Sequence, residues 1–132
     1  MSVVVGYVPT AEGDAALGTA VREAESREVT LIVIISERGH RFAAEPAELQ
    51  AAADEVRRRL ELTGLRYEVR QTTRGHDVAE DIVDAATAQD AQLIVIGLRR
   101  RSPLGKLLLG SNAQRILLDA PCPVLAVKPD PI

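Results

Sequence analysis

The residues with the clearest chemical potential lie between an apolar run and a helical pattern near the C-terminus. The apolar run ends at Gly97, the connection 98–110 carries three consecutive arginines and a lysine, and the helical pattern begins at Ser111. A helix N-terminus presents unpaired backbone N–H groups and a partial positive charge, which suit phosphate. Connections of this length between a strand and a helix are uncommon outside ligand sites. The segment therefore predicts a site for a nucleotide or another small anion.

Each feature of this segment also has an interpretation that needs no ligand. Gly97 is consistent with close approach of a nucleotide to the backbone, and equally with a routine turn glycine. Ser111 and Gln114 have the spacing of a capping box, which satisfies two helix donors without a ligand. The arginines at 99–101 suit a phosphate clamp, but a run of arginines on a loop is usually a solvated patch. These alternatives stay open at the level of the sequence.

Motifs typical of enzymes are incomplete in this chain. Gly105 and Lys106 resemble the end of a P-loop, but Leu107 replaces the required Ser or Thr. No G-x-G-x-x-G follows the first apolar run, so a dinucleotide site is not expected. The two histidines have no cysteine or serine at a spacing typical of a catalytic site. The acidic residues of segment 77–84 lie opposite an apolar helical stripe, as expected for a solvated helix face. We therefore expect no catalytic residues and no metal site.

The composition indicates one globular domain that covers residues 1–132. The chain is 46% hydrophobic and 27% charged, in the usual range for a soluble protein. It has no apolar run long enough for a membrane span, so no membrane partner is expected. The N-terminus lacks the basic and apolar segments of a signal peptide, and the single cysteine, Cys122, fits a reducing compartment. We expect a cytoplasmic protein.

The charge is unevenly distributed along the chain. Up to Ile96 there are 10 basic and 17 acidic residues, a balance of −7, and from Gly97 onward 6 basic and 2 acidic, a balance of +4. The positive potential therefore gathers on the segment of the proposed site, which favours an anionic ligand. The chain has only three aromatic residues, too few for a stacking platform, and is acidic overall. Nucleic acid is not an expected partner.

The apolar pattern predicts an α/β fold. Five apolar runs are expected to be strands, at 3–6, 29–36, 66–72, 92–97 and 123–127. Helical patterns separate them, the last one with Ala113, Ile116 and Leu117 on its apolar stripe. Strict alternation predicts a doubly wound, five-stranded parallel sheet with helices on both faces. The commonest topology gives strand order 3-2-1-4-5, with a ligand at the carboxyl ends of strands 1 and 4.

The last strand predicts an interface. The segment from Pro123 to Val127 should lie at a sheet edge, and a flat apolar edge invites pairing with another chain. A two-fold partner that pairs the same strand would cover it, so we expect a homodimer through this edge. The alternative is that the tail 128–132 shields the strand.

The segment from Gly97 to Lys128 is similar to the universal stress protein family, and the resemblance extends over the whole chain in element order. The nucleotide-binding branch of that family carries a glycine, two residues, a glycine, nine residues, then glycine and Ser or Thr. Gly97 matches the first position, and Gly110 with Ser111 matches the last pair. The middle position is Arg100, and Val8 stands where that branch carries an acidic residue near the base and ribose.

The resemblance implies a dimeric regulator or sensor that binds ATP or AMP. No general base is visible among the residues, so we expect no enzyme activity beyond slow, incidental ATP hydrolysis. No carboxylate can be placed beside the phosphates, so the sequence leaves magnesium dependence open. Arg100 either blocks the ligand or supplies charge to it, so a non-nucleotide-binding dimeric interaction module of the same fold is the alternative. The implied nucleotide-binding residues, first those near the base and then those near the phosphates, are Tyr7, Val8, Pro9, Ile35, Ser36, Gly97, Arg99, Arg100, Gly110, Ser111 and Asn112.

Overall fold

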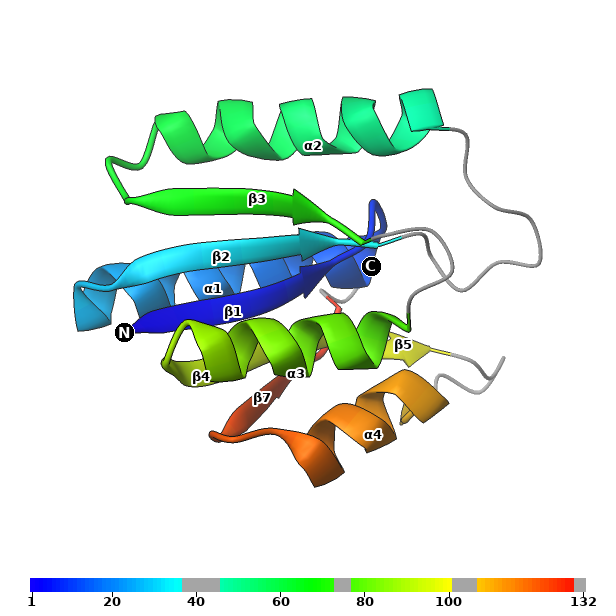
Figure 1. Ribbon diagram of the computed structural model, residues 1–132. Helices are drawn as coiled ribbons and strands as arrows, with labels where there is room; N and C mark the ends of the chain where they lie inside the picture. The colour runs from blue at the N-terminus through cyan, green and yellow to red at the C-terminus, as the bar shows by residue number, and fades with distance from the viewer. Residues whose placement is uncertain (37–45, 73–76, 101–106, 130–132) are drawn as a thin grey trace.

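The computed structural model describes residues 1–36, 46–72, 77–100 and 107–129, and it shows a parallel sheet flanked by helices (Figure 1). The sheet has five strands in the order β3-β2-β1-β4-β7, and a second sheet of two short strands, β5 (Arg99–Arg100) and β6 (Leu107–Leu108), lies beside it. The predicted fold class and strand order are confirmed. The main strands are β1 (Ser2–Tyr7), β2 (Thr30–Ile35), β3 (Tyr67–Gln71), β4 (Ala91–Gly97) and β7 (Val124–Val127).

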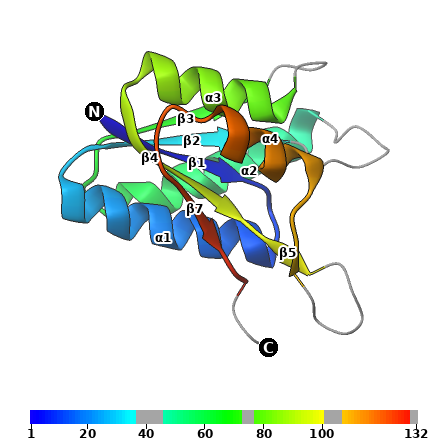
Figure 2. The same cartoon turned by 90° about the horizontal axis from the view of Figure 1, so that it is seen from below.

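Four helices connect the strands. They are α1 (Ala11–Arg27), α2 (Pro46–Glu61), α3 (Val78–Ala88) and α4 (Ser111–Asp119). Figure 2 shows α1 on one side of the sheet and α3 and α4 on the other, and α2 packs into the same apolar core as α1. No helix within the described ranges is long and apolar enough to cross a membrane.

The alternation of side chains along each strand divides the core into two layers. In β1, Val3, Val5 and Tyr7 pack toward α1 and α2, while Val4 packs toward α3 and α4. Successive side chains of a strand point to opposite faces, so the sheet must be apolar on both. The central strands β1, β2 and β4 satisfy this requirement with valine, leucine and isoleucine, which explains why their apolar runs are nearly continuous.

Helix α4 is less deeply buried than its sequence pattern predicts. Ile116 is buried against α3, but Leu117 is 44% exposed and Leu118 is 83% exposed. The stripe prediction is therefore wrong for Leu117. The helix has nine residues and lies near the edge of the sheet, so only one narrow line of its surface meets the core.

The first helix begins at a well-defined cap. The Thr10 hydroxyl accepts a hydrogen bond from the Gly13 N–H at 3.3 Å, which satisfies one free donor of the first turn. One turn further on, Asp14 accepts from the Tyr7 hydroxyl at 3.1 Å and from Arg59 at 3.0 Å. This network links β1, α1 and α2 at the carboxyl end of the sheet. Burial and the neighbouring Asp14 carboxylate raise the pKa of Tyr7 to about 12.

We predict that Tyr7→Phe makes the unfolding free energy less sensitive to alkaline pH. At pH 8 the substitution should cost about 1 kcal/mol of unfolding free energy, because it removes a hydrogen bond. A pKa raised from 10.0 to about 12 means that the folded chain holds the phenolic proton more tightly, so the stability linked to this proton is complete below pH 10 and is lost as the pH rises toward 12. The wild type should lose about 2 kcal/mol more than the variant between pH 8 and 12. Urea titrations of both proteins across this range test the point, and parallel losses would contradict it.

Candidate functional site

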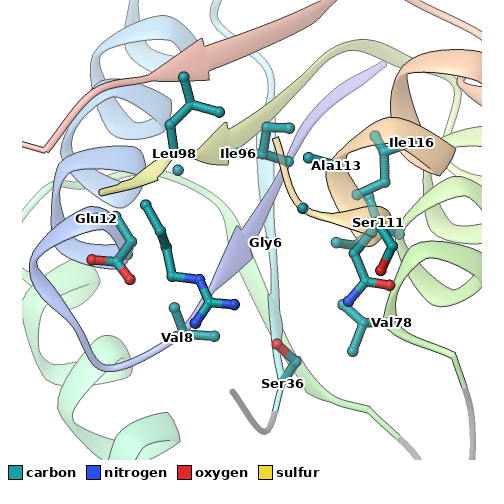
Figure 3. Close-up of a pocket in the computed structure, with 16 residues that line it drawn as sticks. Gly6, Val8, Glu12, Ser36, Val78, Ile96, Leu98, Ser111, Ala113 and Ile116 are labelled. Atoms are coloured by element: carbon teal, nitrogen blue, oxygen red, sulfur yellow. The ribbon is translucent and has the colours of Figure 1, made fainter. Parts of the chain in front are cut away.

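A pocket opens at the carboxyl ends of β1, β2 and β4, where the sequence predicted the ligand site. Its volume is about 260 Å³, and the first turns of α1 and α4 and the start of α3 form its walls (Figure 3). The strand order reverses between β1 and β4, and ligands of doubly wound sheets bind at this reversal. The lining residues are Gly6, Val8, Glu12, Gly13, Ser36, Val78, Ile82, Ile96, Gly97, Leu98, Arg99, Gly110, Ser111, Asn112, Ala113 and Ile116.

The N-terminus of α4 supplies the donors of the pocket. Gly110 is the N-cap in extended conformation, and the first backbone bond of the helix runs from the Gln114 N–H to the Gly110 carbonyl at 3.0 Å. The N–H groups of Ser111, Asn112 and Ala113 precede this bond, so the helix itself gives them no acceptor. All three residues line the pocket. Together with the helix dipole, they form a place for a negative group.

The predicted capping box between Ser111 and Gln114 is wrong. Gly110 and not Ser111 caps the helix, so Ser111 already lies in the first turn, and no described side chain bonds to a cap donor. The Gln114 amide instead donates to the Leu109 carbonyl at 3.1 Å. Because the helix begins one residue earlier than the motif requires, the N–H groups of its first turn have no side-chain acceptor in the described part of the chain. This makes a ligand interpretation of the helix start more attractive.

Gly97 is explained by packing. A Cβ atom at this position would lie 2.4 Å from the carbonyl oxygen of Glu12, in the first turn of α1. Among the described glycines only Gly64 has a positive φ, so Gly97 is not needed for a left-handed turn. Gly13 faces a tighter restriction, because its Cβ would lie 1.7 Å from the Val8 carbonyl oxygen. These two glycines let α1 start directly against the ends of β1 and β4.

The structure brings together seven of the predicted site residues. They come from the ends of β1, β2 and β4, from β5 (Arg99–Arg100) and from the start of α4. Arg99 is half-buried, and its strand pairs antiparallel with β6 (Leu107–Leu108). The side chain of Arg100 and residues 101–106 lie outside the described part of the chain. The seven residues are Val8, Ser36, Gly97, Arg99, Gly110, Ser111 and Asn112.

Three predicted residues do not line the pocket. Tyr7 is the last residue of β1 and not part of the following loop, and its side chain is buried toward α1 and α2. Ile35 is fully buried in the same layer. Pro9 is absent from the lining. Alternation is the reason for Tyr7 and Ile35, since Gly6 and Ser36 face the pocket and the adjacent residues of each strand must face away.

Sequence reasoning missed the contribution of two helix starts. Glu12 and Gly13 enter through the first turn of α1, and Val78 and Ile82 enter through α3. The signal for α1 was present in Thr10, a helix-capping residue placed so soon after β1 that the first turn must lie at the strand ends. No local pattern predicted the part played by α3, because its approach depends on how two layers pack.

A charged contact holds the start of α4 against the start of α3. Arg115 donates to Asp77, and its guanidinium also lies 3.6 Å from the Glu80 carboxylate. Asp77 also caps α3, because its carboxylate accepts from the Ala79 N–H at 2.8 Å. Part of the acidic surface predicted for segment 77–84 thus joins two walls of the pocket. Among the described residues no group of three or more His, Cys, Asp or Glu side chains is placed to bind a metal ion.

These features define a small doubly wound α/β domain with a ligand pocket at its strand switch point. The sequence model of the universal stress protein family matches residues 1–128, and the chain belongs to this family. A universal stress protein from Mycolicibacterium smegmatis is 42% identical over 127 residues, which cover 96% of this chain and 97% of the relative.

Solved structures of the family share the fold. A universal stress protein from Archaeoglobus fulgidus is 33% identical, with a TM-score of 0.80 over 97% of this chain and 98% of the other. A second structure, of the universal stress protein from Archaeoglobus fulgidus in complex with dAMP, is 28% identical, with a TM-score of 0.74 and the same two coverages.

We predict that Gly97→Ala destabilises the fold and that Gly18→Ala does not. The new methyl group at position 97 must displace the first turn of α1, at a cost of about 1–3 kcal/mol. Gly18 lies within the same helix, where a Cβ would meet only the end of Arg22 at 3.7 Å, so alanine should add up to about 1 kcal/mol through helix propensity. Chemical denaturation of the two variants checks this, and equal effects would show that the contact with Glu12 is not tight.

Proposed function

We propose that this protein is a cytoplasmic regulator or sensor that binds an adenine nucleotide at the carboxyl ends of β1 and β4. The observation that carries the proposal is the run of N–H donors at the start of α4, which have no acceptor among the described residues and line a pocket of about 260 Å³. Phosphate fits this helix start, and the half-buried Arg99 adds positive charge to the same pocket.

An apolar part of the pocket wall, beside the start of α4, suits a base. Its wall is apolar where β4 and α3 meet, with Val78, Ile82 and Ile96, and Val8 adds a further apolar side chain from the loop after β1. A flat heterocycle gains affinity from such surfaces, while a few polar groups fix its orientation. The dAMP complex of the Archaeoglobus fulgidus relative supports an adenine nucleotide as the first ligand to test.

The size of the pocket favours a short nucleotide. Pockets for small molecules usually measure about 300–1,000 Å³. A volume of about 260 Å³ lies below this range. We therefore expect AMP to fill the pocket better than ATP does, with the additional phosphates of ATP extending toward solvent.

A binding role accounts for the lining better than catalysis does. Within the described part of the chain, the pocket contains one carboxylate, that of Glu12, and no histidine, cysteine or lysine. Acid–base catalysis of phosphate hydrolysis needs a base that is held against the attacking water, and usually a metal ion. We propose that any hydrolysis is slow and that the nucleotide acts as a signal.

We predict that Ser111→Pro weakens nucleotide binding while Ser111→Ala does not. Ser111 is the first residue of α4, where proline is well tolerated, and Gly110 already has the extended backbone that a residue before proline requires. Proline removes one N–H donor from the pocket and leaves the helix intact, so the dissociation constant for AMP should rise about tenfold. The serine side chain is exposed and makes no hydrogen bond within the described structure, so alanine is the matched control.

Calorimetric titration of both variants and the wild type with AMP and ATP measures the effect. Thermal melting should show equal stability for the two variants. Unchanged affinity in Ser111→Pro would show that the helix start does not hold the phosphate. A wild type that binds neither nucleotide at millimolar concentration would overturn the proposed function in favour of an interaction module that binds no nucleotide.

We further propose a homodimer through β7. This strand pairs with β4 on one side, its other side carries no strand within the described sheet, and Leu125 is 37% exposed. The carbonyls of Pro123 and Val127 accept from β4. Alternation then directs the backbone groups of Val124 and Ala126 toward the open edge, where a second copy of the strand can pair with them.

We predict that Ala126→Pro yields a folded monomer. The substitution removes an N–H that points to the open edge, so it should spare the ladder with β4 and abolish pairing with a partner. Ala126→Val keeps the donor and should remain dimeric. Analytical ultracentrifugation should give the 14.2 kDa mass of one chain for the proline variant and twice that mass for the wild type and the control. A dimeric proline variant would place the interface elsewhere.

A further inference from the structure

Helix α4 is attached to the rest of the domain at few points. Among the described elements it contacts α3 most, and Ile116 is its single buried residue. Leu117 and Leu118, the next two residues, are exposed to solvent. A helix that is held by one buried side chain is free to tilt about that point. The direction of its first turn, which carries the donors of the pocket, therefore depends on a second contact.

Arg115 supplies this second contact. Its guanidinium donates to the Asp77 carboxylate and lies 3.6 Å from the Glu80 carboxylate. Asp77 uses one oxygen for Arg115 and the other to accept from the Ala79 N–H at 2.8 Å. A single carboxylate therefore joins the N-terminus of α3 to α4, one turn after the donors of the pocket.

This ion pair lies directly behind the pocket wall. Val78, the residue after Asp77, lines the pocket, and so does Ile116, the residue after Arg115. Figure 3 shows Val78 beside Ser111, so the starts of the two helices meet at this part of the wall. Asp77 and Arg115 themselves do not line the pocket. We therefore expect the pair to influence a ligand through the position of α4 and not by direct contact.

Such a pair contributes more to geometry than to stability. The Arg115 and Asp77 side chains are 43% and 33% exposed, and ion pairs of this exposure add little to the free energy of unfolding. Hydrogen bonds from helix N–H groups to phosphate depend steeply on distance and angle. A small change in the direction of α4 should therefore cost little stability and a measurable part of the affinity.

We propose that Asp77 and Arg115 are positioning residues of the anion site, which hold the first turn of α4 in the orientation that binds phosphate. This inference rests on the proposed nucleotide site. Charge and position have opposite effects at Asp77. A negative charge close to an anion site repels the ligand, so its removal alone should raise the affinity. If the carboxylate positions α4, its removal lowers the affinity.

Asp77→Asn tests the sign of this effect. Asparagine caps helices as well as aspartate does, so α3 should keep its start. The amide has no negative charge to hold Arg115, so the first turn of α4 loses its fixed direction. The affinity for AMP, measured by calorimetry, should fall about threefold, because the weakened hydrogen bonds to phosphate outweigh the lost repulsion.

A double variant removes the effect of net charge. Asp77→Asn combined with Arg115→Gln has the net charge of the wild type, so charge alone predicts wild-type affinity. Positioning predicts a loss of about fivefold, because no lost repulsion offsets the weakened hydrogen bonds. Arg115→Lys keeps a charged donor, so this variant should bind AMP more tightly than Arg115→Gln does.

Glu68→Gln is the matched control. Glu68 forms an ion pair with Arg70 at 2.9 Å, of similar exposure to the pair of Arg115, and neither of the two residues lines the pocket. The substitution removes the same charge as Asp77→Asn and should leave the affinity for AMP unchanged. Thermal melting of every variant verifies that it is folded at the temperature of the titration.

The outcomes separate the two proposals. If Asp77→Asn binds AMP as tightly as the wild type or more tightly, the positioning role is wrong and the nucleotide site stands. A double variant with wild-type affinity would also overturn the role, as would an Arg115→Lys variant that binds no better than Arg115→Gln. A wild type that does not bind AMP at millimolar concentration would overturn the nucleotide site and the inference together.

Discussion

The rest of the structure depends on the close packing of the first turn of α1 against the carboxyl ends of β1 and β4. Two positions without side chains make this packing possible: Gly13 at the Val8 carbonyl and Gly97 at the Glu12 carbonyl. Protein interiors are close-packed, so a single added methyl group must displace one element from the other. The contact forms one wall of the pocket and fixes the backbone from which Glu12 projects. It also places Asp14 where it can bond to Tyr7 and Arg59.

The two faces of the sheet serve different purposes. The face of α1 and α2 holds the larger apolar layer and a polar network that ties three elements together. The face of α3 and α4 holds the other layer and opens into the pocket. Helix α4 has little apolar contact of its own, and the bond from Arg115 to Asp77 joins it to α3. A short helix with a partly exposed surface can present its N-terminus to a ligand because its first turn is not needed in the core.

The end of β4 connects the pocket with the sheet edge. Gly97 and Leu98 line the pocket, and the Leu98 N–H donates to the Val127 carbonyl of β7 at 2.8 Å. The strand that would contact a ligand is therefore bonded directly to the strand that we propose to pair with a second copy. The two proposed functions share β4 because its carboxyl end lies at the switch point and its neighbour is the last strand of the sheet.

The sequence by itself determined the strand order, the position of the pocket and the helix start that lines it. Continuous apolar runs that alternate with helical stripes permit few other topologies. The positions of Gly97, Gly110 and Ser111 on either side of the basic connection predicted where the pocket lies. The tertiary structure decided which of two neighbouring residues in a strand faces the pocket. It placed Tyr7 and Ile35 in the core and Gly6 and Ser36 at the pocket, a choice set by the pleat of each strand. It also brought Glu12, Val78 and Ile82 to the site. Val78 and Ile82 belong to α3, whose contact with β4 arises only when its layer packs on the sheet, so no local pattern encodes their place. For Glu12 the capping residue Thr10 was the local signal.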